Sequence, residues 1–336
     1  MQITTLGIDL AKSVFQLHGI DANGGVILKK KVRRGAFLQV LSDLSPCLIG
    51  MEACATSHYW AREIAALGHE VRLIPPAYVK PYVKRQKNDM ADAEAICEAV
   101  TRPNMHFVAI KSADQQAVLM LHRARDLLVR QRTMLVNALR AHLAEFGIVA
   151  ARGPQQVRCL VTDLENATDG LPEVGRAALL CLVRQLDAQE AEIARLDREI
   201  KAWHGQSETS QRLATIPGIG VLTATALAAT VADPGLFKSA RQFSAWLGLV
   251  PRQNSSGGKE RLGRITKMGD AYLRKLLVVG ATAVLRHAIR AQTRTGEWVR
   301  HLLERKPSRL VSVALANKTA RIAWAVLAKG ETYRSA

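Results

Sequence analysis

The fold of this chain is decided near its start, by the stretch Ile3-Thr4-Thr5-Leu6-Gly7-Ile8-Asp9-Leu10. This stretch is largely apolar and predicts a buried β-strand, and residues 14–20 alternate in the manner of a second strand. The turn signal Asp21-Ala22-Asn23-Gly24-Gly25 then leads into a third strand over 26–32. The sequence therefore begins with three predicted strands.

Helices and strands alternate after this unit. Their predicted order is a helix near 37–44, a strand at 47–51, a helix near 57–67 and a strand at 70–74. This alternation predicts an α/β layer with a mixed sheet. Pro75-Pro76 ends the last strand, and a basic stretch over 80–87 leads into a helix predicted over 88–100.

Charge points to the class of partner. Among 336 residues, 47 are Lys or Arg and 29 are Asp or Glu, a net charge of +18 that attracts polyanions. We expect nucleic acid as the partner and no membrane, because no apolar run nears the roughly 20 residues that span a bilayer.

The start of the chain lacks the basic region of a signal peptide, which predicts a cytoplasmic protein. Its five cysteines are scattered and predict neither a disulfide framework nor a zinc site.

Two long helices are expected in the middle of the chain. The first covers 113–146, and Arg123/Arg130 and Arg125/Arg132 occupy adjoining stripes of it, either as a solvated face or as a phosphate-tracking one. A linker follows over about 147–170. The second helix carries a coiled-coil pattern with alternating spacings of three and four. Its members are Leu179, Leu182, Leu186, Gln189, Ile193, Leu196, Ile200 and Trp203.

This coiled-coil pattern has two structural interpretations. The two long helices form an antiparallel hairpin within one chain or pair between chains, although an ordinary amphipathic helix explains the spacing nearly as well. A helix-rich C-terminal domain is expected after them. The predicted division is thus 1–112, 113–205 and 206–336.

Four acidic residues form a candidate metal site. Asp9 lies inside an apolar strand and Glu52 closes another, and a lone charge in such a place is costly unless it is compensated. Asp89 and Asp92 lie three apart on one face of the predicted helix, where Asp89 as an N-cap and Asp92 as a first-turn residue is the simpler explanation. Carboxylates in this arrangement suit a pair of Mg²⁺ ions, which stabilise the attacking and leaving oxygens of an in-line displacement at phosphorus.

A candidate nucleophile lies in the C-terminal third. Small residues in Ser255-Ser256-Gly257-Gly258 allow close approach to a phosphate, although a flexible loop explains the same composition. A serine hydroxyl needs activation, and no histidine lies nearby in the sequence. The cations that follow could hold the strand being cut. They are Lys259, Arg261, Arg264 and Lys267.

A helix-hairpin-helix is predicted over 213–224. Its turn places Gly218 and Gly220 before a helix N-terminus, where backbone N–H groups can contact a phosphate without reading sequence. An ordinary tight turn between helices is the alternative. Asp270 is predicted to be a helix N-cap rather than a catalytic acid.

As a set, these motifs resemble the DEDD transposases, recombinases of the insertion sequence 110/1111 family. The resemblance covers nearly the whole chain, with the motifs in the family's order and with a double serine and a short length like the 1111 branch. The motifs are residues 7–12, 50–54, 87–93, 216–220 and 246–259.

The resemblance implies a fold and a mechanism. Expected are a RuvC-like (RNase H-like) domain with Asp9, Glu52, Asp89 and Asp92 as Mg²⁺ ligands, a coiled-coil insertion, and a C-terminal transposase domain. Ser256, rather than Ser255, matches the nucleophile that forms a phosphoserine link to DNA. Also implied are donor and target DNA, a non-coding guide RNA, and dimers and tetramers whose sites take carboxylates from one subunit and serine from another.

Two other functions are weighed against this one. In a RuvC-type junction-resolving nuclease, metal-activated water attacks and Ser256 only positions phosphate. In a non-enzymatic nucleic-acid-binding protein, the arginine-rich helix and the hairpin motif suffice and Asp9 is dispensable.

Overall fold

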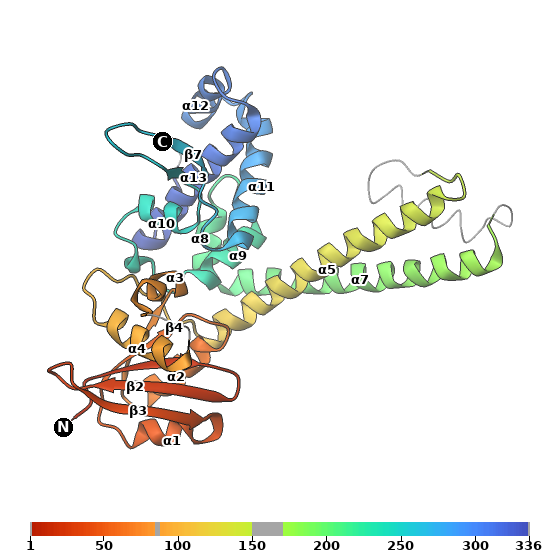
Figure 1. Ribbon diagram of the computed structural model, residues 1–336. Coiled ribbons are helices and arrows are strands. Elements are labelled where there is room, and N and C mark those ends of the chain that lie inside the picture. Colours follow the sequence, from red (N-terminus) through yellow and green to blue (C-terminus); the bar gives the residue numbers. More distant parts are fainter. Residues whose placement is uncertain (1, 85–87, 150–170, 335–336) are drawn as a thin grey trace.

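The computed structural model describes residues 2–84, 88–149 and 171–334. The chain forms an N-terminal sheet domain, a long helical hairpin and a helical C-terminal domain (Figure 1). Most of the predicted linker over 147–170 and the end of the basic stretch, 85–87, lie outside the described residues.

The N-terminal domain is built on the expected mixed sheet. Five strands follow the order β3-β2-β1-β4-β5, with β1, β2 and β3 antiparallel and β1, β4 and β5 parallel. Helices α1, α2 and α4 agree with the three predicted helices to within a few residues, whereas the short α3, η1 and η2 were not predicted. The bounds are β1 Thr5–Leu10, β2 Val14–Ile20, β3 Val26–Arg33, η1 Arg34–Ala36, α1 Phe37–Ser42, β4 Leu48–Glu52, α2 Ser57–Ala66, β5 Glu70–Ile74, α3 Pro76–Val79, η2 Lys80–Tyr82 and α4 Asp89–Val100.

Two separate apolar cores pack against the two faces of this sheet. On one face, Phe15, Phe37 and Trp60 pack edge to face, with ring centroids 4.5–5.2 Å apart. On the other, α4 packs through Ile96 and Val100. The first core contains side chains of β1 and β4, among them Ile8 and Ile49, and the second contains Leu48 of β4 and Ile74 of β5.

Helix α4 approaches the sheet unusually closely, at two glycines. A Cβ atom added to Gly7 of β1 would lie 2.2 Å from the carbonyl oxygen of Ala93 and 2.5 Å from the amide nitrogen of Cys97. A Cβ on Gly50 of β4 would lie 2.8 Å from the Val100 Cβ. Gly7 and Gly50 are paired in the register. Missing side chains on adjacent strands therefore make the groove in which α4 lies.

The two long helices form an antiparallel hairpin within one chain. Helix α5 spans Ala113–Ala144 and α7 spans Glu173–Gln206, and the hairpin projects away from both domains (Figure 1). Most of the predicted seam is buried, but Val183, which the predicted pattern omitted, is buried as well, whereas Leu182 is only partly buried. The polar seam residue Gln189 donates to the side chain of Gln131 across the hairpin at 3.5 Å.

The C-terminal domain is helical but also contains a β-hairpin. The expectation of helices alone, with a flexible Ser/Gly loop, was incomplete, because strands β6 and β7 pair around residues 254–261. Three or four residues per strand carry too little alternation to be recognised in a sequence. The bounds are α8 Glu208–Ala214, α9 Val221–Thr230, η3 Pro234–Leu236, α10 Ala240–Trp246, β6 Pro251–Gln253, β7 Leu262–Ile265, α11 Ala271–Ala288, α12 Arg294–Leu303 and α13 Ser308–Lys329.

Helix α13 forms the centre of this domain. Its Val311, Leu315, Ala316, Ala320 and Ala323 belong to the C-terminal core. By length and composition it is the one helix of the described residues that could cross a membrane, and 44% of its most apolar window is buried inside the protein. As predicted, Asp270 caps α11, accepting from the backbone of the first turn.

A buried polar contact joins the hairpin to the C-terminal domain. His122 of α5 is 1% exposed, and its ring nitrogens lie 3.0 Å from the Tyr272 hydroxyl and 2.9 Å from Thr225 Oγ1. Nearby, Asp126 of α5 pairs with Lys275 of α11. These contacts connect α5 to α9 through Thr225 and to α11 through Tyr272 and Lys275, and they fix the root of the hairpin against both helices.

Replacing Gly7 by alanine tests the helix–sheet contact. We expect Gly7→Ala to lower the free energy of unfolding by about 2 kcal/mol or more, because the added methyl group displaces α4. Gly35→Ala is the matched control, since a methyl group there meets nothing within 4 Å. Urea unfolding measures both variants, and equal stability of the two would contradict the steric argument.

Acid should loosen the joint at His122. Burial, followed by the charge of Arg125, lowers the pKa of His122 from 6.5 to about 4. Between these values the unfolded chain binds more protons than the folded chain, so stability falls as the pH falls from 6.5 to 4, by about 3 kcal/mol for such a shift.

Unfolding measured against pH checks this expectation. His122→Gln should flatten the slope between pH 6.5 and 4, whereas a change at the exposed His142 of the same helix should leave it unchanged. His58, whose pKa burial also lowers to about 4, contributes a remaining slope of the same sign in both variants. An unaltered slope in His122→Gln would show that this histidine does not carry the effect.

Candidate active site

Two carboxylates end the central strands of the sheet. Asp9 lies near the end of β1 and Glu52 is the last residue of β4, and the parallel register pairs the preceding residues, Ile8 and Met51. Side chains alternate along a strand, so Asp9 and Glu52 project on the same face as Gly7 and Gly50. That face is the one that α4 covers. Both side chains are half-buried, and both make contacts within the protein.

Helix α4 brings two more carboxylates to this edge. The prediction that Asp89 could cap the helix was wrong, because the cap is Asn88, whose side-chain oxygen accepts from the Ala91 amide at 2.8 Å. Asp89 and Asp92 instead occupy the first turn. The helix dipole favours negative charge there, but Asp89 and Asp92 have no capping role that would explain their position.

Three of the four predicted ligands meet. Carboxylate oxygens of Asp9, Asp89 and Asp92 all lie within 4.8 Å of one another, and Glu52 lies outside that set on the same face of the sheet. Carboxylates this close repel one another unless a cation lies between them. Oxygen ligands only, on partly exposed side chains, fit a hard divalent cation with coordination positions left for phosphate.

The predicted nucleophile lies at the tip of a protruding arm, residues 251–265. Gly257 and Gly258 have φ of +55° and +76°, as in the two central positions of a type I′ turn, and the Lys259 amide donates to the Ser256 carbonyl at 3.1 Å. All residues from Pro251 to Arg264 are exposed. The glycines are therefore required by the turn, and the turn presents the serines to solvent.

The two serines of the arm differ in their surroundings. Ser255 Oγ accepts from the Arg261 amide across the arm at 3.1 Å. Within the described part of the chain, the Ser256 hydroxyl has no hydrogen bond, and it lies next to the turn. A hydroxyl held by the arm is less available to a phosphate than one without an internal partner.

Within one chain, the arm and the acidic cluster lie far apart. Figure 1 shows the arm extending sideways from the C-terminal domain, well separated from β4 and α4 in the sheet domain. The fold of a single subunit thus does not bring Ser256 to Asp9, Asp89 and Asp92.

Some of the predicted nucleic-acid-binding cations are exposed, and others contact acidic residues of the protein itself. Lys259, Arg261 and Arg264 are exposed, as is Lys267, the one residue other than glycine with a positive φ among those described, +56°, where the chain passes Gly248. The two arginine stripes of α5 face different surroundings. Arg123 and Arg130 are exposed, while Arg125 pairs with Asp197 of α7 and Arg132 lies in a groove beside Asp187 and Glu190.

The two glycines of the predicted helix-hairpin-helix also differ. Gly218, with φ of +87°, packs on α11, where a Cβ would lie 2.9 Å from Val284 Cγ2. Gly220 caps α9, and a Cβ there meets nothing within 4 Å. Gly218 therefore has a packing role, and Gly220 is the one with open space for a ligand.

Sequence reasoning overlooked residues that position this site. Gly7, Gly50 and Asn88 determine where α4 lies and how it begins, but none carries chemistry of its own. The pairing of glycines on two adjacent strands is a usable signal, because glycine is unfavourable inside a strand unless another segment approaches it closely.

Two models of known protein families match the chain. The model described as "Transposase IS116/IS110/IS902 family" matches residues 210–295, which include the helix-hairpin-helix and the serine arm. An IS110-type DEDD model, described as a transposase, matches residues 6–148, which include all four carboxylates.

Relatives with similar sequences cover almost the whole chain. A probable family 20 transposase of Pseudomonas aeruginosa is 48% identical, with 99% of each chain covered. The transposase for insertion sequence element IS1328 of Yersinia enterocolitica is 44% identical, with 98% of each chain covered. The transposase for IS1111A of Coxiella burnetii is 43% identical over 99% of this chain and 92% of its own.

The acidic cluster predicts an effect of Mg²⁺ whose sign depends on the charge of Asp92. Without metal, Asp92→Asn should raise the melting temperature, because it relieves repulsion among the three carboxylates. With Mg²⁺ the order should reverse, since the variant should bind the ion about tenfold more weakly or worse and gains less stability from it.

Thermal unfolding in EDTA and in Mg²⁺ checks both halves of this expectation. Asp114→Asn is the control, since Asp114 is an exposed aspartate in the first turn of α5, as Asp92 is a partly exposed one in the first turn of α4. If the cluster binds no cation, Asp92→Asn should melt at a higher temperature than the wild type both in EDTA and in Mg²⁺.

Proposed function

Because this chain belongs to the IS116/IS110/IS902 family of DEDD transposases, we propose that it cuts and rejoins DNA through a serine nucleophile and a carboxylate-bound divalent cation. Membership makes it a transposase of an insertion sequence, with DNA as substrate and with use of a divalent metal. The proposal adds the nucleophile, the identity of the ion as Mg²⁺, the guide RNA and the assembly. The meeting of Asp9, Asp89 and Asp92 is the observation that carries it.

The four carboxylates would hold the metal. Asp9, Asp89 and Asp92 supply oxygens that already lie together, and Glu52 completes the set from the adjacent strand. When bound, two Mg²⁺ ions would neutralise charge on the phosphate and on the attacking and leaving oxygens. The strand order β3-β2-β1-β4-β5, with α4 on one face, supports the RuvC-like, RNase H-like domain that the family resemblance implies.

Ser256 would attack the scissile phosphate. A bond forms between its Oγ and phosphorus while the bond from phosphorus to the 3′ oxygen breaks, so the DNA becomes linked to the protein and a 3′ hydroxyl is released. The serine proton passes to solvent or to a carboxylate of the site, and the leaving oxygen takes up a proton. Lys259, Arg261, Arg264 and Lys267 lie on or beside the arm, where they can hold the strand, and Gly220 and the exposed stripe Arg123/Arg130 extend the contact to the phosphates beyond.

The distance between arm and carboxylates supports a site shared between subunits. One subunit would supply the acidic cluster and another the arm, so activity requires at least a dimer, and a tetramer when two DNA sites are joined. The hairpin offers a surface for such pairing, because Met120, Leu127 and Met134 recur every seven residues on α5 and are 69%, 47% and 69% exposed. A single chain leaves this apolar stripe uncovered.

Guide RNA is the remaining part of the proposal. The net charge of +18 attracts polyanions in general, and it supports the presence of RNA beside DNA in the assembly. On this proposal, RNA that co-purifies with the protein has loops complementary to the DNA that flanks the gene. Random cellular RNA in that fraction would contradict guidance while leaving the DNA chemistry untouched.

Covalent adducts distinguish the serine mechanism from its alternatives. After reaction with DNA carrying the element ends, Ser256→Ala should leave no DNA attached to denatured protein, whereas Ser255→Ala, the matched control, should leave most of it attached. A RuvC-type nuclease cuts but leaves no adduct even in the wild type. A non-enzymatic binding protein is indifferent to Asp9→Ala and transfers no strand.

Mixing two inactive variants tests the shared site. Asp92→Asn supplies an intact arm and Ser256→Ala supplies an intact acidic cluster, so the mixture should recover part of the activity that each lacks alone. Recovery of about a quarter to a half is expected where subunits exchange freely and each site needs one of each. No recovery in mixed assemblies would place both groups in one subunit and overturn the arrangement.

A further inference from the structure

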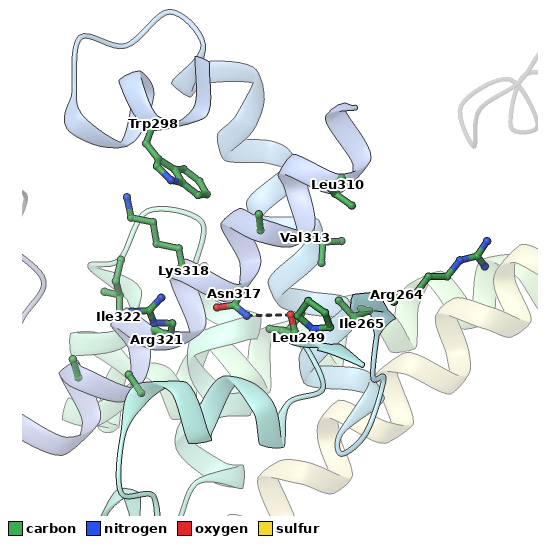
Figure 2. A pocket seen from close by; sticks show the side chains of 15 residues that line it. Leu249, Arg264, Ile265, Trp298, Leu310, Val313, Asn317, Lys318, Arg321 and Ile322 are labelled. Atoms are coloured by element: carbon green, nitrogen blue, oxygen red, sulfur yellow. Dashed lines mark hydrogen bonds between the residues drawn. The ribbon is translucent and has the colours of Figure 1, made fainter. Parts of the chain in front are cut away.

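A pocket of about 780 Å³ lies beneath the arm, between β6, β7 and helix α13 (Figure 2). Its apolar wall comes from Leu310, Val313 and Ile322 of α13 and from Ile265 of β7. The indole of Trp298 reaches over it from α12 (Figure 2). This volume falls in the range of sites that enclose small organic groups, and it is more than packing around one side chain requires.

The polar groups of the pocket are few and fixed. Asn317 donates through Nδ2 to the Leu249 carbonyl at 3.0 Å, which holds its side-chain amide in one orientation with Oδ1 left as an acceptor. Lys318 lies over the Trp298 ring, with its Nζ 4.9 Å from the centroid. Flat aromatic and aliphatic surfaces beside one oriented amide are the elements that recognise a nucleobase.

The charge at the pocket has one sign. Lys318, Arg321 and Arg264 contribute three cations, and the described residues that line the pocket include no aspartate or glutamate. Arg264 extends outward from the arm rather than into the pocket (Figure 2). Cations at the rim of an apolar cavity complement a phosphate chain that passes outside while a base enters. An apolar helix of a protein partner would leave these cations without a counterpart.

We propose that this pocket binds one unstacked base of the DNA strand whose phosphate meets the arm. The inference rests on the proposed function, since the arm that carries Ser256 also forms one wall of the pocket. A base held there would fix the register of the strand on β6 and β7. The phosphates on either side of that base would then reach Lys318 and Arg321. The pocket thus has a positioning role, separate from the attack by Ser256.

Short single strands test the pocket without the cleavage reaction. The probes are fluorescein-labelled dT12, the same sugar–phosphate chain without bases, and rU12, each titrated in EDTA. Wild-type protein should bind dT12 about tenfold more tightly than the abasic chain, because one base stacks in the pocket. Trp298→Ala should bind dT12 and the abasic chain equally, and Trp298→Phe should keep most of the preference for dT12.

Two further variants keep the test independent of folding and of charge. Ala314→Phe fills the pocket from α13 and should equalise dT12 and the abasic chain without removing the indole. Lys318→Gln and Arg321→Gln should each reduce the salt dependence of log Kd by about 0.7 while leaving the ratio of dT12 to abasic chain unchanged. Circular dichroism of each variant should match that of the wild type, which would show that the helix content is unchanged.

Several outcomes would overturn the inference. An unchanged ratio in both Trp298→Ala and Ala314→Phe shows that no base enters the pocket. A pocket-dependent preference for rU12 over dT12 assigns the pocket to RNA instead. A loss of self-association in Trp298→Ala, measured by sedimentation, assigns it to a second copy of the chain. Failure of the serine mechanism would give a different result. Wild-type protein would then form no covalent adduct with DNA but would still bind dT12 more tightly than the abasic chain.

Discussion

The close approach of α4 to β1 and β4 is the contact on which the acidic cluster depends. Gly7 and Gly50 leave a groove in the sheet, and backbone atoms of Ala93 and Cys97 occupy the space that a side chain at Gly7 would take. The first turn of α4 therefore lies at the end of β1, and Asp89 and Asp92 come within 4.8 Å of Asp9. Bringing three carboxylates together is unfavourable because they repel one another. The packing of Ile96 and Val100 behind them stabilises the helix in this position and offsets that repulsion. A tight apolar contact thus holds an electrostatically unfavourable arrangement, as is common at sites built to receive a cation.

A second constraint acts at the root of the hairpin. His122, Tyr272 and Thr225 connect α5 to α11 and α9 in the interior, so the hairpin, which follows the sheet domain in the chain, is fixed to the C-terminal domain. The serine arm belongs to that C-terminal domain and is well separated from the sheet domain of its own subunit (Figure 1). On the proposed mechanism, this separation would prevent cutting before assembly, because neither half of the site has a complete reaction path. On the same proposal, the apolar stripe on α5 would pair subunits, and the pocket beneath the arm would position the DNA strand.

Much of the sheet domain could be predicted from the sequence, because period-two alternation and proline or glycine punctuation mark strands of five residues or more. All five strands and the cap at Asp270 follow from such local signals. Strands β6 and β7 could not be predicted, since three and four residues carry no usable period and their pairing depends on a turn of two glycines. Val183 joined the hairpin seam because a real helix of 3.6 residues per turn drifts from a strict heptad pattern. Asn88, rather than Asp89, is the N-cap of α4, because the backbone of Asn88 is extended and the helix begins at the next residue.

The sequence by itself determined which chemical groups the protein has and in what order. A carboxylate in an apolar strand, a double serine before two glycines and a large excess of cations indicate DNA chemistry regardless of how the chain packs. Tertiary structure alone decided which of these groups meet. It brought Asp9 to Asp89 and Asp92, directed Arg125 and Arg132 toward α7 and Arg123 and Arg130 toward solvent, and kept Ser256 distant. The physical reason is that proximity across 80 residues depends on the close packing of whole elements, here a helix in a groove of two glycines, and local sequence patterns do not record that packing.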